Sequence, residues 1–534
     1  MSWSIGFLSA LTKKSISPTY RLKIRSLQPG YGDFNITSTS SNIAIGREGP
    51  TINAQRVIPG SYNITFGGFT VPIVGQVNSN SALDIFPRIS KGVFAELFCT
   101  LNGVEERIAC GQLRGIKKTY NKYVFEFVDI IAALGSRYEL QQSAVTGITT
   151  PDPFALFYNA GIEIPLTSDW TFTTTFPNRL YVNDLRPFTL EAGEFGVVIC
   201  RPSGGNDFIL KFDAKTITSG NQGFLNLSHV YSTSSTIYPT VYSPVNLTVS
   251  DKVYTAQYVK GWPGDIFAKL ILSEAGTPYD PLRTYPPSMN AGISLDDSFY
   301  DKQDSHYYKN HLRGRGPTFA NYEIGYVISN PLNNGLRDLI TVFARAGHWP
   351  VWRQNAITYR AVQNPESFSD FTEINDSDIY DLKQHEIFDT NQQNVYLRSE
   401  LIYQNKAGVE TKHSMPVSVI GKSLPIKSIT TRNVSGLYSY DPWTASANRL
   451  NLAQGDVDRL LIWDGYLWEK LQITCKVFYA KLCPGDIVKL SSNVIAPFTF
   501  KKNQTYSKTA FMVSGVDYSI NQGIAVLTLL RPLK

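Results

Sequence analysis

The chain has 534 residues, of which 43% are hydrophobic and only 18% are charged. At about 150 residues per domain, this length predicts three or four domains, each large enough to bury its own core. The charged fraction is below the about 25% of ordinary globular chains, which argues against a disordered, coiled-coil or halophilic protein. The net charge is +6, and because the lysines and arginines are scattered as pairs, the sequence lacks the clustered cations of a nucleic-acid-binding footprint.

The N-terminus predicts a short docking helix. Met1 to Leu11 is apolar, but its lysines follow the apolar part and no clear small-residue cleavage site comes after it, so a signal peptide is not expected. No uninterrupted apolar run approaches the about 20 residues needed to cross a bilayer, so we expect no membrane-spanning segment.

Residues 18–145 alternate apolar and polar side chains in the manner of β-strands. Representative runs are Tyr20 to Ile24, Val93 to Phe98 and Tyr123 to Val128, and turn residues such as Pro-Gly and Asn-Gly separate the strands. This spacing is typical of a small barrel or sandwich, with one helical turn expected over Val128 to Leu134.

Residues 146–254 are rich in Thr, Ser and Tyr and carry polar β patterns such as Trp170 to Phe176. They predict an inserted β-sandwich-like domain that lies on the outside of something larger.

Residues 255–430 add helices to strands. Pro263-Gly264-Asp265 is a helix start signal. A second helix is indicated by the apolar stripe of Leu336, Leu339, Ile340 and Phe343, which ends near Gly347. A hairpin follows over residues 350–362, with Gln354-Asn355 as its turn. This region therefore predicts an α+β domain.

Residues 431–534 are expected to begin with a helix and to end in strands. The helix carries apolar residues on one side, namely Val457, Leu460, Leu461, Leu467 and Trp468. The expected strands are Ile473 to Ala480, Asp486 to Leu490, Phe511 to Val516 and Ile524 to Leu530.

The two ends of the chain share a pattern. Gly92-Val-Phe-Ala-Glu-Leu97 lines up with Gly485-Asp-Ile-Val-Lys-Leu490, and Leu113-Arg-Gly-Ile116 lines up with Val513-Ser-Gly-Val516, in the same order. In each copy a strand enters from a Gly turn, and a second strand is interrupted by Gly where a small barrel must bend. The pattern predicts duplicated barrels; the alternative is coincidental convergence of short β motifs.

Together these observations predict a fold that is mainly β with an α+β middle: multidomain, with two related small β-barrels plus an inserted β-sandwich-like domain. The expected divisions are an N-terminal docking segment, a first β-barrel domain, the inserted domain, the α+β domain and a second β-barrel domain, at residues 1–17, 18–145, 146–254, 255–430 and 431–534.

Of the six histidines only two fall close together, beside a group of aspartates: His306 and His311, with Asp296, Asp297, Asp301 and Asp304. These side chain types can bind a metal ion, but a five-residue spacing does not place two imidazoles on one helical face. Ser294 with Asp297 three residues later is typical of a helix cap. We therefore expect a solvated helix start here.

Catalytic motifs are missing from the sequence. No nucleophile elbow, phosphate-binding loop, dinucleotide-binding fingerprint or zinc-protease motif occurs. Asp370 with Glu373 remains a conceivable glycosidase pair, because such enzymes need only two acids several Å apart. Arg313-Gly314-Arg315-Gly316 is either a phosphate contact or, as we expect, a solvated linker.

Cysteines and tryptophans favour packing roles. The five cysteines form no Cys-x-x-Cys pair, so we expect reduced, buried thiols at Cys99, Cys110, Cys200, Cys475 and Cys483. A sugar-stacking platform is one reading of the tryptophans, but packing in cores or subunit interfaces is expected for Trp262, Trp349, Trp352, Trp443, Trp463 and Trp468. The sequence thus predicts no catalytic residues, no metal site and no cofactor.

An N-terminal β-barrel, an α+β middle and a related C-terminal barrel together resemble the central hub proteins of the tail tip or baseplate of tailed bacteriophages. The similar stretches are Cys110 to Ile116 leading to Val128 to Ile131, Leu336 to Val362, Cys483 to Leu490, Met512 to Val516 and Ala525 to Leu529. The resemblance covers residues 18–140 and 255–534.

That resemblance implies a structural virion protein, not an enzyme, made in the bacterial cytoplasm and located at the tail tip or baseplate. It implies a homotrimer whose two barrels per chain make a ring of six similar units, joining the sixfold tail tube to a threefold tip in virus assembly and host attachment. Its partners would be distal tail or tail-tube proteins, the tape-measure protein and tip or fibre proteins, with genomic DNA passing only transiently through the channel.

Region 146–254 departs from the simplest hub pattern, and it would dock fibres or neighbouring tail proteins. Two alternatives stay open for the whole chain. One is a tail protein that binds or degrades cell-surface glycan, and the other is the spike hub of a bacterial secretion system.

Overall fold

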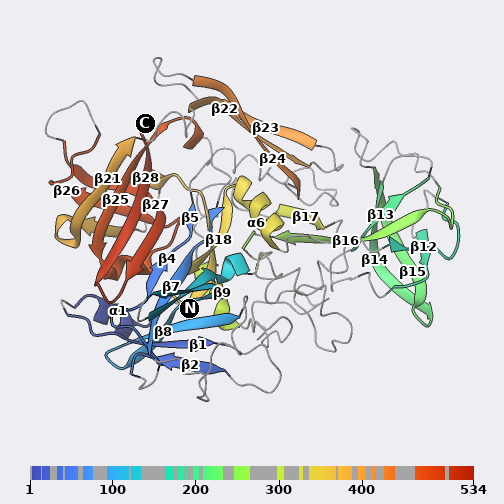
Figure 1. Cartoon of the computed structure of the whole chain (residues 1–534). Coiled ribbons are helices and arrows are strands. Elements are labelled where there is room, and N and C mark those ends of the chain that lie inside the picture. Colours follow the sequence, from blue (N-terminus) through green and yellow to red (C-terminus); the bar gives the residue numbers. More distant parts are fainter. Residues whose placement is uncertain are drawn as a thin grey trace.

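The structure is a computed structural model of the chain. It describes residues 3–13, 15–24, 33–39, 43–57, 64–75, 93–119, 122–133, 163–171, 178–185, 188, 196–203, 208–232, 246–261, 263–264, 267, 297–305, 324–328, 336–367, 371–387, 395–404, 410–416, 426–438, 463–498 and 504–533. Most of these residues lie in antiparallel strands, with few helices (Figure 1). The mainly β class predicted from the sequence is therefore confirmed.

The chain opens with the expected helix, α1 (Ile5–Leu11). Its N-cap is Ser4, whose side chain accepts a hydrogen bond from the N–H of Phe7, which satisfies one of the free donors at a helix start. α1 buries Phe7, Ala10 and Leu11 against β8 (Phe94–Leu101) and β9 (Val104–Thr119).

The N-terminal strands form one continuous run of ladders. They are β1 (Thr19–Ile24), β2 (Phe34–Thr37), β3 (Ile43–Ile45), β4 (Thr51–Asn53), β7 (Gly68–Gly75), β8, β9 and β10 (Lys122–Asp129). Their order is β2-β1-β8-β9-β10-β7, and both β3 and β4 pair with β7. The short β5 (Arg56–Val57) and β6 (Ile64–Thr65) pair with each other. The helical turn expected after β10 is present at residues 130–133.

A second run lies at the C-terminal end of the chain. It consists of β20 (Thr372–Asn375), β21 (Ile379–Ile387), β25 (Leu467–Lys476), β26 (Ile487–Ser492), β27 (Tyr506–Ser519) and β28 (Ile524–Leu533), with the 3₁₀ helices η5 (Asp376–Asp378) and η6 (Val477–Lys481) between them. The order is β26-β27-β28-β25-β21, and β20 pairs in parallel with β26.

Two details of the C-terminal prediction were wrong. Leu467 and Trp468, expected on a helix, begin strand β25, because this segment pairs with β28 along its whole length and that ladder outweighs a local helical spacing. The strand expected to reach Ala480 ends at Lys476, where the chain turns into η6.

β4 joins the two runs into a single 14-stranded sheet, since it pairs with β7 on one side and β27 on the other. The ladders of the described strands do not close into a ring in either run, so the two closed barrels predicted from the sequence are not found. The physical reason is that part of the β27 edge is hydrogen-bonded to β4 of the other run. Apolar side chains from both runs share one core.

A 10-stranded sheet contains the strands of the predicted insertion. Its members are β11 (Glu163–Ile164), β12 (Asn178–Val182), β13 (Gly196–Arg201), β14 (Phe208–Ser219), β15 (Gln222–Ser232), β16 (Lys252–Gly261), β17 (Ile324–Ile328), β22 (Val395–Gln404), β23 (Glu410–Pro416) and β24 (Ile426–Tyr438). β12 to β15 stand apart from the C-terminal strands (Figure 1). The described strands of the insertion belong to this one sheet, and β16 continues its ladder from β13 to β17.

The middle of the chain contributes a helix and a hairpin as predicted. The helix α6 (Leu336–Arg345) is followed by β18 (His348–Arg353) and β19 (Ala356–Ala361), and Gln354 at the turn has a positive φ of 58°. The 3₁₀ helices η3 (Asp297–Phe299) and η4 (Pro365–Ser367) flank this unit. In the part of the chain that the structure describes, no helix is long and apolar enough to cross a membrane.

Candidate functional site at the junction of two repeated units

The two runs contain a repeated unit, visible in how their strands pair. In repeat 1, Phe94 of β8 lies opposite Gln112 of β9. In repeat 2, Ile487 of β26 lies opposite Met512 of β27. These are the partners that the sequence alignment requires. A backbone hydrogen bond repeats as well, from Leu113 N–H to Val93 O and from Val513 N–H to Asp486 O, at 2.8 Å in both.

The aligned glycines lie at the same irregularity. The β9–β10 ladder shifts register beside Gly115, which lies opposite Glu126, and the β27–β28 ladder shifts beside Gly515, which lies opposite Thr528. A glycine beside an extra, bulged residue is typical of a sharply bent strand. The predicted duplication of this motif is therefore confirmed, although neither copy closes into a barrel.

The repeat extends to further strands. Phe69 of β7 pairs with Phe127 of β10, as Leu471 of β25 pairs with Leu529 of β28. On the other side of these strands, Ile52 of β4 pairs with Phe69 and His385 of β21 pairs with Leu471. Repeat 1 is therefore β4 with β7 to β10, repeat 2 is β21 with β25 to β28, and β4 corresponds to the second half of β21.

β4 makes the junction between the repeats. Ile52 pairs with Tyr518 and Asn53 with Asp517, at the end of β27 beyond its bulge. Gly67, next to this strand, must be a glycine: a Cβ there would lie 2.5 Å from the backbone oxygen of Asn53. Strand β4 of repeat 1 thus pairs with the edge of repeat 2.

The residues after β4 continue the contact along β27. The N–H of Ala54 donates to the oxygen of Val516 at 3.0 Å, and the hydroxyl of Ser514 donates to the oxygen of Val57 at 2.6 Å. Arg56 forms an ion pair with Asp517 at 2.5 Å. Residues 52–57 therefore cover β27 from Tyr518 back to the bulge.

The tip of the β18–β19 hairpin touches both repeats. The indole N–H of Trp352 donates to the oxygen of Ile108 in β9 at 3.3 Å. The side chain of Gln354 donates to the oxygen of Lys481 at 3.2 Å and accepts from the N–H of Trp3 at 2.6 Å. The hairpin therefore fixes the N-terminal segment and both repeats together.

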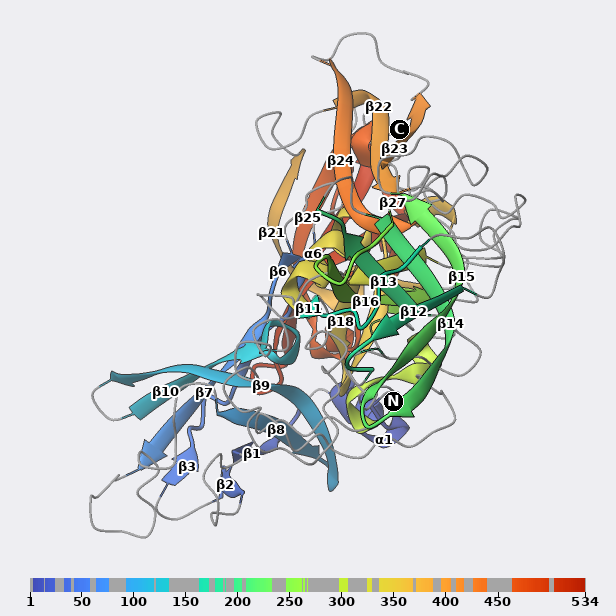
Figure 2. The ribbon, with the colours of Figure 1, turned by 90° about the vertical axis from the view of Figure 1, so that its right-hand side faces the viewer.

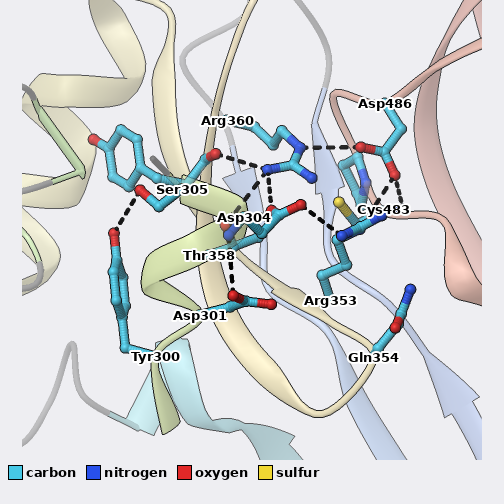
Figure 3. Close-up of polar contacts among 12 residues, drawn as sticks. Tyr300, Asp301, Asp304, Ser305, Arg353, Gln354, Thr358, Arg360, Cys483 and Asp486 are labelled. Atoms are coloured by element: carbon cyan, nitrogen blue, oxygen red, sulfur yellow. Dashed lines mark hydrogen bonds and ion pairs between the residues drawn. The ribbon is translucent and has the colours of Figure 1, made fainter. Parts of the chain in front are cut away.

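A buried ion network holds both strands of the same hairpin (Figure 3). Asp304 accepts hydrogen bonds from Arg353 at 2.6 Å and from Arg360 at 2.7 Å, and Arg360 also donates to Asp486 at 3.0 Å. Burial by itself would raise the pKa of Asp304, but the positive charges of Arg360 and Arg353 outweigh burial and hold that pKa well below its ordinary value. The network ties the helical turn at residues 302–305, the hairpin and the loop before β26 into one body.

A second buried cluster lies inside repeat 2 around Glu469, whose side chain is fully buried. Glu469 pairs with Arg531, accepts a hydrogen bond from the hydroxyl of Tyr506, and lies 2.7 Å from Nε2 of His385. Burial opposes ionisation, but the hydrogen bond from His385 and the charge of Arg531 lower the pKa of Glu469 to about 2. This is the arrangement of a permanently charged structural carboxylate.

Repeat 1 holds a buried carboxylate of a different kind. Asp129 accepts hydrogen bonds from the N–H groups of Gly67 at 2.6 Å and Ala132 at 2.7 Å. Burial nonetheless raises the pKa of Asp129 to about 6. Asp129 also lines a cavity of about 30 Å³ between the repeats and the hairpin, which has room for about two water molecules and none for an organic cofactor.

Several sequence candidates lie outside the described residues: Asp296, His306, His311, Arg313 to Gly316 and Asp370. Of the others, Asp301 accepts a hydrogen bond from the N–H of Asp304, and Glu373 accepts one from Ser491 at 3.0 Å. The helical turn at Asp297 is present, but Asp301 is buried rather than solvated. Asp304 is partly buried, because Arg353 and Arg360 of the hairpin pair with its carboxylate. Within the described ranges no three His, Cys, Asp or Glu side chains are grouped to hold a metal ion.

The expectations for sulfur and aromatic residues are confirmed where they are described. All five cysteines are buried thiols. Trp349, Trp463 and Trp468 pack in one core cluster, and Trp352 is partly buried. Trp262 and Trp443 lie outside the described residues.

No family model matches the sequence, and no curated protein does. Among solved structures, a tail protein from Neisseria meningitidis MC58 shares 8% identity at a TM-score of 0.32, with 96% of each chain covered. The 43 kDa tail protein of prophage MuSo2 from Shewanella oneidensis shares 10% identity at a TM-score of 0.33, with 97% of each chain covered. A chain of the virion of a native gene transfer agent shares 12% identity at a TM-score of 0.19, covering 47% of this chain and 84% of that one. TM-scores of this size carry no argument about function.

Proposed function

We propose that this chain is a structural protein of a bacteriophage tail, and that three copies form the hub of the tail tip or baseplate. The hub joins the tail tube to the host-recognition tip and surrounds the passage for DNA. The function of the hub is assembly rather than catalysis. Its neighbours are distal tail or tail-tube proteins, the tape-measure protein and tip or fibre proteins, and it resides in the virion after synthesis in the bacterial cytoplasm.

The observation that carries this proposal is the repetition of one strand unit within the chain, with the two copies side by side and joined through β4. A homotrimer of such a chain presents six similar units around one axis, which is what a threefold object needs in order to match a sixfold tube. The carboxylates of Asp304 and Glu469 also fit a structural role, because both form ion pairs with arginines.

The division of labour along the chain is part of the proposal. Residues 18–145 and 431–534, together with β21 of repeat 2, form the ring. The rest of residues 255–430 supports the ring, and residues 1–17 dock onto it. The inserted region, 146–254, carries a separate core that includes Trp170, Phe212 and Leu225, and it docks fibres or neighbouring tail proteins at the outside.

Size-exclusion chromatography with light scattering tests the central claim. A purified chain at micromolar concentration should elute at about 179 kDa, three times the mass of the 59.6 kDa chain. Mass spectrometry of purified particles should give three copies per tail. A monomer in both measurements, with no co-assembly with tail proteins, contradicts the hub; hydrolysis of a glycan that is lost on changing a single Asp or Glu contradicts the scaffold.

A further inference from the structure

The two repeats differ at one edge. In repeat 2 the end of β27 beyond its bulge is covered by residues 52–57. The corresponding edge of repeat 1 is Arg114 to Lys118 of β9, and no described strand pairs with it on that side. Arg114, Lys117 and Lys118 are exposed. Among the residues that the structure describes, repeat 1 therefore has a vacant edge where repeat 2 has an occupied one.

The space above the two bulge glycines shows the same difference. A Cβ on Gly515 would lie 3.1 Å from Cγ of Arg56, whose side chain covers that glycine. A Cβ on Gly115 would meet only the carboxylate of Glu126, at 3.7 Å. The position that Arg56 fills over repeat 2 is open over repeat 1 in the described part of the chain.

Repeat 2 contains a strand suited to pair with this edge of β9, namely β21. The second half of β21 corresponds to β4. Among the described strands β21 pairs only with β25, so no described strand pairs with its outer edge. Three apolar side chains along β21 are exposed, Tyr380 at 60%, Leu382 at 38% and Ile387 at 38%, and the charged Asp381 and Lys383 between them are exposed as well. An exposed apolar edge strand is a ready template for pairing with another strand.

β21 cannot reach β9 of its own chain. Six strands separate them in the sheet order, namely β10, β7, β4, β27, β28 and β25, and the two lie apart in both views (Figure 1, Figure 2). A second copy of this chain can supply a partner for each edge.

We propose that the outer edge of β21 in one copy adds as a strand to the vacant edge of β9 in the next copy, repeating between chains the junction that β4 makes within one. This inference deepens the proposed hub by naming its contact between copies. The equivalence of Asn53 with Glu386, and of Asp517 with Lys117, places Glu386 opposite Lys117. The contact is head to tail, and such a contact closes into a ring when the rotation per copy allows it.

The charges agree with this register. Glu386 and Lys117 have opposite signs, and opposite charges directly across a strand pair are favourable. Each already has a partner in its own chain, Lys470 at 2.9 Å and Glu126 at 2.6 Å, but the side chains remain 39% and 70% exposed. The side chains of Glu386 and Lys117 can therefore also pair with each other between two copies.

Disulfide trapping tests the register. The double variant Lys117→Cys with Glu386→Cys, treated with diamide, should give covalent dimers and trimers on a non-reducing gel that collapse to monomer with reductant. The five native thiols are buried, so the engineered pair should dominate. A second pair, Asn53→Cys with Asp517→Cys, reports on the same kind of contact within one chain and should give a crosslinked monomer.

An out-of-register pair, Lys117→Cys with Asp381→Cys, is the matched negative control and should give at least tenfold less covalent oligomer. Gly115→Leu supplies an independent readout, because its side chain would occupy the vacant space: it should abolish the trimer while leaving the melting temperature of the monomer unchanged.

The outcomes separate the two proposals. A wild-type trimer whose Lys117–Glu386 variant crosslinks no better than the negative control, and whose Gly115→Leu variant still assembles, overturns the strand contact and leaves the hub standing. A wild-type chain that stays monomeric overturns the hub itself. Crosslinking in register together with loss of the trimer in Gly115→Leu supports both.

Discussion

The two repeats place different chemistry at one equivalent pair of positions. Glu469 of β25 lies opposite Arg531 of β28 in repeat 2, and Gly67 lies next to Asp129 in the corresponding ladder of repeat 1, where the N–H of Asp129 donates to the oxygen of Gly67. Both carboxylates are buried. Yet the pKa of Glu469 falls to about 2 and that of Asp129 rises to about 6. Burial acts in the same direction on both, so the hydrogen bond from His385 and the charge of Arg531 decide the sign of the shift at Glu469.

β4 explains why repeat 1 lacks such a cation. A side chain at position 67 would collide with the backbone of Asn53, Ala54 and Gln55, which crosses there on its way to β27. The strand that joins the repeats therefore excludes from repeat 1 the ion pair that repeat 2 contains. Asp129 instead relies on backbone N–H donors.

The largest expected effect follows from removing the charge of Glu469. Glu469→Gln leaves Arg531 without its anion, and breaking one half of a buried ion pair costs about 3–5 kcal/mol. Urea unfolding at pH 7 measures it. Because the pKa of Glu469 is lowered on folding, its contribution is present above about pH 4.5 and is lost as the pH falls toward about 2. The deficit of the variant should shrink over that range.

Glu386→Gln is the control for that experiment. Glu386 also pairs with a cation, Lys470, but its side chain is 39% exposed, and exposed pairs contribute about 0–1 kcal/mol. Equal losses for the two variants would contradict the role assigned to burial.

A smaller effect with the opposite pH dependence is expected at Asp129. A carboxyl whose pKa rises on folding stabilises the folded state below its unfolded pKa, and that contribution is lost as the pH rises through about 6. Two pKa units correspond to roughly 3 kcal/mol. Relative to Asp129→Asn, the wild type should therefore lose about this much stability between pH 4 and pH 7.

Urea unfolding of both proteins across that range provides the measurement, and the difference between them removes the contribution of every other carboxylate. A difference that is independent of pH, or that grows in favour of the wild type toward pH 7, contradicts the assignment.

The sequence predicted the repeated motif because its signal is local. A glycine beside a bulge and an alternation of apolar and polar residues can both be recognised from a few neighbouring residues, as at Gly115 and Gly515. The helix and hairpin of residues 336–362 were predictable for the same reason. Barrel closure was wrongly predicted, since only long-range pairing decides whether an edge closes on its own unit or accepts β4. β4 is three residues long, too short for any periodicity to reveal.

The candidate site was even less visible in the sequence. Asp304, Arg360 and Asp486 lie far apart along the chain, and nothing in their spacing indicates that they meet. From the sequence alone, Asp304 is only a candidate metal ligand. Glu469 and Asp129 carry no motif at all, because burial and neighbours supplied by other strands create their shifted pKa values.

The smallest expected effect separates the two bulge glycines. Gly515→Ala places a methyl group 3.1 Å from Cγ of Arg56, so that side chain must move, and we expect a loss of about 1 kcal/mol, at the low end of overpacking costs. Gly115→Ala meets only the mobile end of Glu126 at 3.7 Å and should change monomer stability by less than about 0.5 kcal/mol. Thermal unfolding of the dilute monomer compares them directly. Equal losses would mean that the edge of β9 is already covered within the chain, which removes the vacancy that a second copy is proposed to fill.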